Sequence, residues 1–368
     1  MLTVISYILM LDSLLCPADS ATLGLSRIDG ARTVTVFTPS TCDTLPHYSN
    51  GAVLTAFKDK LYCMWQASSR DEDSPDTSVL YSISSDNGNS WSAPKTLVRA
   101  TQSHFYTSGG WWVSGDTITA FINTWHHEQE PKGGTTQYIT STDGNTWSEL
   151  QPVTMHDGTP LLALIEQDPH ILQSGRIITA AHFMPGMNVY PIYTDDPSGH
   201  SGWHKALFTP HIRGSQTREL EPSTYLCKDG TVVMVFRDQS GTFRKMASVS
   251  HDNGATWSSP TITNIPDART KQCAGNLPDG TAYLIGCPVS YKKRWPLTIM
   301  TSTDGRLFDK AWLLLDGDTD LQPRRYKGKA KTLGYSYPKA IVHNTFLFVA
   351  YSVNKEDIQV TRIPITLP

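Results

Sequence analysis

One short phrase occurs four times in this chain and constrains the fold more than any other feature. The copies span Ser84–Trp91, Ser141–Trp147, Ser250–Trp257 and a weaker Ser302–Phe308. In each copy a Ser stands two residues before an Asp, a Gly follows closely, and an aromatic residue ends the phrase. Asp and Ser side chains bond the backbone of turns, and Gly adopts positive φ angles. Each copy follows an apolar run, so we predict that each is a hairpin turn.

The spacing of this Asp-centred repeat predicts the number of structural units. A degenerate copy lies in Tyr193–Trp203, and the five aspartates are separated by 57, 53, 56 and 52 residues: Asp86, Asp143, Asp196, Asp252 and Asp304. Another step of that size ends near residues 355–357. A period of about 50 residues with several short strands is typical of a propeller blade. We therefore predict an all-β, six-bladed β-propeller with four-stranded antiparallel blades, with seven blades as the alternative.

The two ends of the chain are predicted to close the ring. Three strand-like runs, residues 339–342, 346–351 and 358–363, supply most of a last blade, and residues 33–37 supply its fourth strand. Pairing the two ends removes the exposed sheet edge that an open array would leave. We therefore expect a single propeller domain over residues 21–368.

Composition narrows the range of partners. The chain has 39% hydrophobic and 18% charged residues, and its net charge at pH 7 is -3. This charge gives no electrostatic argument for binding nucleic acid or an anionic membrane. We expect a monomer with neither of these as a partner.

The first twenty residues are predicted to be a secretory signal, which makes the protein secreted and extracellular. Residues 2–15 are mostly apolar but too short to span a bilayer, and residues 18–20 are small or polar as at a cleavage site. No Lys or Arg precedes the apolar run and Asp12 interrupts it, so an unstructured extension is the alternative.

Loss of the signal would leave an odd number of cysteines, so at least one thiol is unpaired. No C-x-x-C spacing typical of a metal or redox site occurs. Cys63 and Cys227 lie in apolar strand-like runs, and we expect them to be buried.

Two pairs of polar residues occupy equivalent places in successive repeats. Glu221 and Arg237 are 16 residues apart and flank a turn at Asp229, and Glu166 and His182 repeat the same separation. Such a separation suits one hairpin, and we expect both pairs to face the central axis. The alternative is that they are strand-end ion pairs that hold neighbouring blades together.

The Asp-centred repeats are Asp-boxes, and from about residue 30 the chain resembles the sialidase superfamily. Glu221 and Arg237 match the carboxylate and second arginine of that superfamily, Arg294 resembles its third arginine, and residues 335–337 resemble the region of its nucleophilic tyrosine. Sialidases clamp one carboxylate with three arginines. The first arginine is missing, because the nearest candidate, Arg27, lies outside a convincing strand. The resemblance therefore does not imply sialic acid as the substrate.

Several phrases resemble a second group of propeller enzymes, which remove terminal L-rhamnose from α-1,4-linked glucuronic acid and include lyases. The phrases are residues 62–66, 219–223 and 353–357, and they accompany an unusual number of histidines. The resemblance implies a secreted lyase whose partner is a glycan with terminal rhamnose on a uronic acid.

The chemistry of elimination suggests roles for the candidate residues. The uronate carboxylate must be neutralised, and we assign this to Arg237, helped by Arg218 or Arg294. A base must take the C5 proton and an acid must protonate the leaving oxygen. Histidine suits both tasks, so His104 and His127 are the candidates, and Tyr337 is the reserve acid. The predicted substrate-binding residues are His47, Glu166, His182, Arg218, Glu221 and Arg294.

Two other functions remain open. A glycoside hydrolase would use paired carboxylates, for which Glu166 could act with Glu221 or Asp73. A glycan-binding propeller without turnover would use aromatic residues such as Trp111, Trp112 and Trp125. No cofactor is required for any of these functions, and the acidic run at residues 71–73 is either a solvated loop or a set of ligands for a structural calcium ion.

Overall fold

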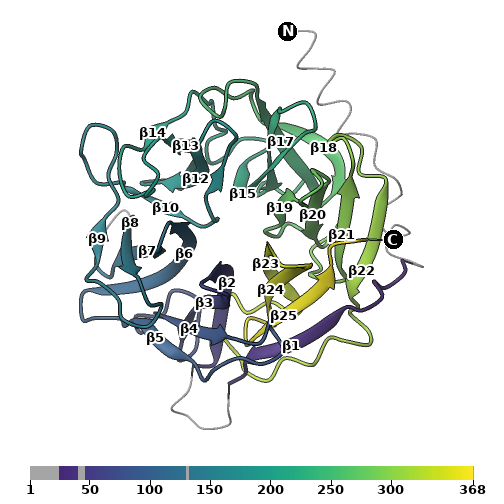
Figure 1. Cartoon of the computed structure of the whole chain (residues 1–368), viewed down its shortest axis with the longest axis horizontal. Helices are drawn as coiled ribbons and strands as arrows, with labels where there is room; N and C mark the ends of the chain where they lie inside the picture. The colour runs from purple at the N-terminus through teal and green to yellow at the C-terminus, as the bar shows by residue number, and fades with distance from the viewer. Residues whose placement is uncertain (1–24, 40–45, 130–131, 368) are drawn as a thin grey trace.

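The computed structural model describes residues 25–39, 46–129 and 132–367. Within these ranges the strands form six antiparallel sheets, and Figure 1 shows the sheets arranged in a ring around one axis. The predicted six-bladed, all-β propeller is confirmed, and the seven-bladed alternative is wrong. No helix in the described part of the chain is long and apolar enough to cross a membrane.

Each of the first five blades runs outward from the axis in chain order. Blades I and II contain β2 (Tyr48–Phe57), β3 (Lys60–Ser68), β4 (Ser78–Ser84), β5 (Lys95–Val98), β6 (His104–Ser114), β7 (Thr117–His126), β8 (Gly134–Ser141) and β9 (Gln151–Pro152). Blade III contains β10 (Ala163–Ile165), β11 (His170–Ile171), β12 (Ile177–Phe183), β13 (Asn188–Thr194) and β14 (His204–Lys205). Blades IV and V contain β15 (Glu219–Leu226), β16 (Val232–Asp238), β17 (Arg244–Ser250), β18 (Thr261–Pro266), β19 (Cys273–Asn276), β20 (Ala282–Gly286), β21 (Leu297–Ser302) and β22 (Lys310–Leu315).

Blade VI closes the ring with strands from both ends of the chain. It contains β23 (Tyr335–His343), β24 (Phe346–Val353) and β25 (Asp357–Pro364), and β1 (Arg32–Phe37) pairs with β25 as the fourth strand. This confirms the predicted closure. The repeat period also predicts a sixth Asp-box near residues 355–357. The turn at these residues is not an Asp-box, because it joins the second and third strands of the blade. Elsewhere the Asp-box joins the third and fourth strands, and here the fourth strand comes from the other end of the chain.

The Asp-box turns have the predicted side-chain bonds. Ser84 Oγ donates to Asp86 Oδ1 at 2.8 Å and accepts from the Gly88 amide at 2.9 Å, while the Ser90 amide donates to Asp86 Oδ1 at 2.9 Å. Gly88 has a φ of 77°, which favours glycine. Each turn also packs against the preceding blade, and a Cβ on Gly144 of blade II would overlap Tyr62 of blade I.

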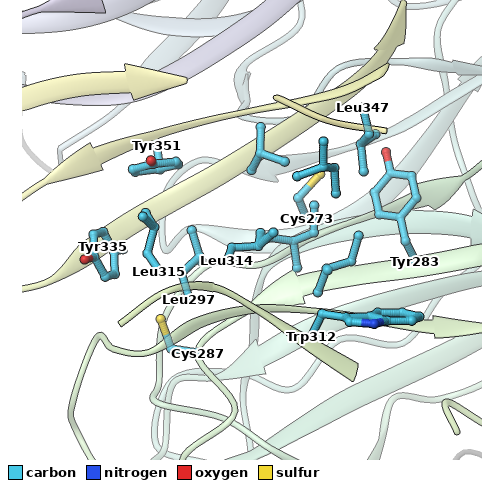
Figure 2. Close-up of a cluster of buried hydrophobic side chains, with 14 of the residues drawn as sticks. Cys273, Tyr283, Cys287, Leu297, Trp312, Leu314, Leu315, Tyr335, Leu347 and Tyr351 are labelled. Carbon is cyan, nitrogen blue, oxygen red and sulfur yellow. The ribbon is translucent and has the colours of Figure 1, made fainter. Parts of the chain in front are cut away.

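The core is divided among the six blade interfaces. Each interface holds a cluster of buried apolar side chains, and Figure 2 shows the cluster between blades V and VI, with Tyr283, Leu297 and Tyr351. The described cysteines are buried free thiols, as predicted for Cys63 and Cys227. The predicted signal over residues 1–20 lies outside the described residues.

Four of the innermost strands contain a β-bulge close to the site. The pairing register shifts at Asn50/Val53 in β2, Ser108/Trp111 in β6, Leu220/Ser223 in β15 and Ser336/Lys339 in β23. Glu221 and Tyr337 lie in these bulges with φ angles of 53° and 59°. Bulges re-aim side chains and occur frequently beside active sites. Strained backbone of this kind also clusters at such sites.

Candidate active site

All six blades contribute to one cavity of about 210 Å³ on the central axis. It lies beside the first halves of the innermost strands, on the side of the loops that join the second and third strands of each blade. Its lining is rich in charge, with four acidic and four basic side chains besides a histidine and a tyrosine: Glu72, Asp73, Glu166, Glu221, Lys132, Arg237, Lys271, Lys339, His182 and Tyr337.

Arg237 and Glu221 form a buried ion pair in this cavity. Arg237 Nη1 lies 2.8 Å from Glu221 Oε2, and the two side chains are 12% and 6% exposed. Burial lowers the pKa of Arg237, but Glu221 and the neighbouring Tyr337 outweigh burial and hold that pKa above its usual range. Within the described chain, Arg237 Nε has no hydrogen-bond partner. This donor is therefore free to bind a ligand.

Tyr337 lines the cavity with Arg237 and lies close to a second buried guanidinium, that of Arg294. The Cζ atom of Arg294 is 5.7 Å from the centre of the Tyr337 ring, and Arg294 Nη1 donates to Ser336 Oγ at 2.7 Å. Arg294 is 9% exposed and pairs with no carboxylate of the described residues. Burial, and then the charge of Glu221, raises the pKa of Tyr337 well above its usual value. The phenol is therefore protonated at neutral pH, next to cationic groups.

His182 contacts two of the four acidic residues of the site, Glu221 and Glu166. Its Nε2 accepts a hydrogen bond from the Glu221 amide at 3.2 Å, and its Nδ1 lies 3.8 Å from Glu166 Oε2. Burial lowers the pKa of His182, so the ring is neutral at neutral pH. Because Nε2 is the acceptor, we assign the ring proton to Nδ1, which faces Glu166.

Two lysines that were not predicted hold Glu166 in place. Lys271 Nζ and Lys339 Nζ both donate to the Glu166 carbonyl oxygen, at 2.6 and 2.7 Å. Lys271 Nζ also lies 3.4 Å from Glu166 Oε2. Burial raises the pKa of Glu166, but Lys271 and then His182 outweigh burial and lower that pKa to about 2. Glu166 is therefore an anion held across the hub by blades V and VI. A lysine within a predicted strand, as at Lys339, was the available sequence signal.

The acidic run at residues 71–73 is neutralised by cations. Glu72 Oε1 accepts hydrogen bonds from Lys355 Nζ and Tyr48 Oη, each at 2.9 Å. Asp73 Oδ2 lies 2.6 Å from Lys132 Nζ. Over the described ranges, no group of three or more His, Cys, Asp or Glu side chains is arranged to hold a metal ion. The expectation of a calcium site in this run therefore has no structural support.

The structure brings the Glu221/Arg237 and Glu166/His182 pairs and Tyr337 together, but not the two predicted catalytic histidines. His104 pairs with His126 at the end of the β6–β7 hairpin, and its Nδ1 lies 2.8 Å from Ser103 Oγ. His127 Nε2 lies 3.2 Å from the Thr101 carbonyl. Neither residue lines the cavity. The hairpin does bring both to one rim, next to the Phe105–Trp125 pair, but of these residues only Trp125 lines the cavity.

Four other predicted or considered residues also lie outside the lining, and one of them is Arg294, which contacts Tyr337. His47 stacks on Tyr326, with ring centres 4.0 Å apart. Arg218 Nη2 donates to the Gly186 carbonyl at 2.7 Å. Arg27, the nearest candidate for a first arginine, instead pairs with Asp320 at 2.7 Å.

The tryptophans divide between two cavities. Trp125 lines the site, whereas Trp111 and Trp112 line a second cavity of about 440 Å³, farther along the innermost strands. Of the described residues, only Lys339 lines both cavities. An aromatic platform for a sugar in the site is therefore limited to Trp125 among these three.

Comparison with known proteins agrees with this architecture. The family described as the BNR repeat-like domain matches residues 59–349, and no curated protein matches the chain. Among solved structures, a protein of unknown function from Dyadobacter fermentans has a TM-score of 0.68 and 15% identity, with 91% of this chain and all of that one covered. The intramolecular trans-sialidase from Ruminococcus gnavus has a TM-score of 0.67 and 12% identity, with 93% and 99% covered.

A third solved structure, a mutant of the NanB sialidase from Streptococcus pneumoniae, has a TM-score of 0.65 and 13% identity, with 90% of this chain and 70% of that one covered. At such identities these likenesses show the fold alone. The family match covers well over half of the sequence and agrees with the Asp-boxes and the six blades. This chain therefore belongs to the BNR repeat-like domain family, and its fold is similar to that of the sialidase propellers.

Proposed function

We propose that this protein is a secreted glycan-processing enzyme whose cavity takes an acidic sugar, and that it releases terminal L-rhamnose from α-1,4-linked glucuronate by β-elimination. One observation carries the proposal: Arg237, with a free Nε donor, shares a cavity with Tyr337, and Arg294 lies behind that ring. A buried donor without a hydrogen-bond partner, such as Arg237 Nε, is costly unless a ligand accepts a hydrogen bond from it. A uronate carboxylate supplies such an acceptor.

The site residues can be given roles in this reaction. Arg237 binds the carboxylate and stabilises the negative charge that develops when the C5–H bond breaks. Glu166 takes that proton, the electron pair forms the C4–C5 double bond, and the C4–O bond breaks. Tyr337, protonated because burial raises its pKa, donates a proton to the oxygen that leaves with rhamnose. With a pKa near 2 Glu166 is a weak base, so this step relies on stabilisation of the carboxylate by Arg237.

Retaining hydrolysis is the second candidate, and the closeness of Tyr337 to Glu221 favours it. The charge of Glu221 acts directly on the Tyr337 phenol. A carboxylate beside a tyrosine can accept the phenol proton as the phenol oxygen attacks the anomeric carbon and the glycosidic C–O bond breaks. The leaving oxygen takes a proton from water, and a second water then hydrolyses the bond between the sugar and the tyrosine. Sialidases are the known case of a tyrosine nucleophile among glycosidases.

A product analysis separates these functions. The protein is incubated with a rhamnose-capped arabinogalactan, and both free rhamnose and the ultraviolet absorbance of an unsaturated uronate are followed. Rhamnose with new absorbance supports elimination, and rhamnose without absorbance supports hydrolysis. Release of sialic acid from sialyl-lactose would indicate a sialidase, and binding without any product would indicate a glycan-binding propeller. The Arg237→Ala variant is the control, because an enzyme loses rate whereas a binding protein loses only affinity.

A further inference from the structure

Two loops beside the site concentrate positive charge. Residues 287–296, between β20 and β21, and residues 322–331, before β23, contain eight of the 31 lysines and arginines and no acidic residue. The whole chain has a net charge of -3. The segments that carry these loops lie side by side, because Arg294 and Gly334 form a parallel bridge. We call residues 287–296 and 322–331 the basic rim.

Part of this charge is neutralised within the protein. Arg325 forms ion pairs with Glu356 and Asp357, and Lys331 Nζ lies 3.2 Å from Glu356 Oε1. These contacts fix the loop of residues 322–331 to blade VI. They account for two of the eight basic residues.

The remaining surface cations have no acidic partner among the residues that the structure describes. The exposed Arg324 donates only to the Lys331 carbonyl, at 2.9 Å. Across residues 25–39, 46–129 and 132–367, no ion pair forms with the side chains of Lys292, Lys293, Lys327 or Lys329. Because like charges repel, this concentration is unfavourable in the free protein. An anionic ligand with several charges would relieve it.

Aromatic rings lie among these cations. Lys293 Nζ is 4.6 Å from the centre of the Trp295 ring. Tyr291 is 42% exposed, and Tyr326 stacks on His47 at the other end of the rim. Aromatic faces pack against sugar rings, and basic side chains bind the carboxylates that uronates carry. The mixture therefore suits an acidic carbohydrate.

The basic rim is continuous with the cavity. Arg294 belongs to the rim and lies beside Tyr337, which lines the cavity. The Lys329 amide donates to Asp71, whose neighbour Glu72 lines the cavity. A chain whose end occupies the cavity can therefore leave it across the rim.

We propose that the basic rim binds the anionic backbone of an acidic polysaccharide, so that the substrate is a uronate-rich polymer and not a short neutral oligosaccharide. The proposal rests on the proposed function in one respect, because it takes the occupant of the cavity to be a sugar. It adds the substrate class and assigns the recognition of the polymer to residues outside the cavity.

Direct binding tests the proposal without requiring turnover. The probes are a polygalacturonate of defined length, neutral dextran, and a single-stranded DNA of matched charge, and affinity is measured at low and high salt. The test variant is Lys292→Gln/Lys327→Gln. The control is Lys60→Gln/Lys228→Gln, which removes the same charge from exposed residues at the opposite ends of the innermost strands.

We expect polygalacturonate to bind the wild type, with an affinity that falls with salt. The rim variant should bind about tenfold more weakly at low salt, and the control should bind like the wild type. Equal affinity of the rim variant and the wild type would overturn the proposal, as would DNA or dextran that binds as tightly as polygalacturonate. Loss of rim-dependent binding and loss of product formation are separate results. Absence of product alone refutes only the proposed reaction.

Discussion

Substitution Lys339→Met tests the buried charge at the centre of the propeller. Lys339 is 2% exposed in β23 and donates to the Glu166 carbonyl and to Gln167 Oε1. Burial, and then the charge of Lys271, lowers the pKa of Lys339 from 10.5 to about 7. Between these two pH values the unfolded chain binds one more proton at this position than the folded protein does. The free energy of unfolding therefore rises with pH across that window.

The magnitude follows from the width of the window. Each pH unit within it contributes up to about 1.4 kcal/mol. From pH 7.5 to 9.5, Lys339 should therefore add about 2 to 3 kcal/mol to the stability of the wild type. Methionine does not titrate, so the variant lacks this rise. Lys331 and Lys355, whose pKa values burial also lowers, titrate in both proteins and cancel in the difference.

Urea unfolding followed by tryptophan fluorescence at several pH values measures this difference. The wild type should gain stability relative to Lys339→Met as the pH rises, whatever the offset between the two proteins at pH 7.5. Variant Lys60→Met, which changes an exposed lysine, should run parallel to the wild type. Parallel curves for Lys339→Met and the wild type would refute a folded-state pKa near 7.

Three further predictions, which use four substitutions, test the site and the scaffold. Arg237→Ala should lower kcat/KM on the rhamnose-capped glycan about 10² to 10³-fold, because the carboxylate loses its main donor; unchanged kinetics would remove Arg237 from the mechanism. Tyr337→Phe should lower kcat by about 10²-fold or more, whereas His104→Ala, outside the cavity, should stay within about threefold; the reverse order would restore the histidine pair as catalyst. Gly144→Ala should lower the free energy of unfolding by about 1 to 3 kcal/mol in a urea titration, because φ is 73° and the new methyl group would meet Tyr62; a midpoint equal to that of the wild type would contradict this packing.

The fold could be predicted because its signals are local. The Ser, Asp and Gly of each Asp-box form hydrogen bonds within one turn, so seven or eight consecutive residues are enough to predict that turn. Their spacing then gives the blade count without any knowledge of distant contacts. The Asp-box period does not hold near residues 355–357, because ring closure takes the fourth strand of blade VI from the other end of the chain. A repeat period extended along the sequence does not show that this strand comes from the other end of the chain.

The site could be predicted only in part, because some of its contacts cross the hub. The offset of 16 residues found both Glu221/Arg237 and Glu166/His182, since each pair spans one hairpin: β15 pairs with β16, and β10 with β12. The lysines that bind the Glu166 carbonyl lie 105 and 173 residues away in sequence. No periodicity connects residues at such separations. The β6–β7 hairpin brings His104 to a rim of the propeller, but a sequence separation does not say how far along the axis the cavity extends.

The same bulge in several innermost strands explains how a repetitive scaffold holds an asymmetric site. In blades IV and VI the bulge places a functional side chain, Glu221 or Tyr337, on a backbone with positive φ. Such backbone persists only where the surroundings fix it. Gln272 Nε2 of blade V donates to the Glu221 carbonyl at 2.8 Å, and Arg294 bonds Ser336, the residue before Tyr337. Neighbouring blades therefore hold each strained residue, and the chemistry of one blade depends on the polar side chains of the next.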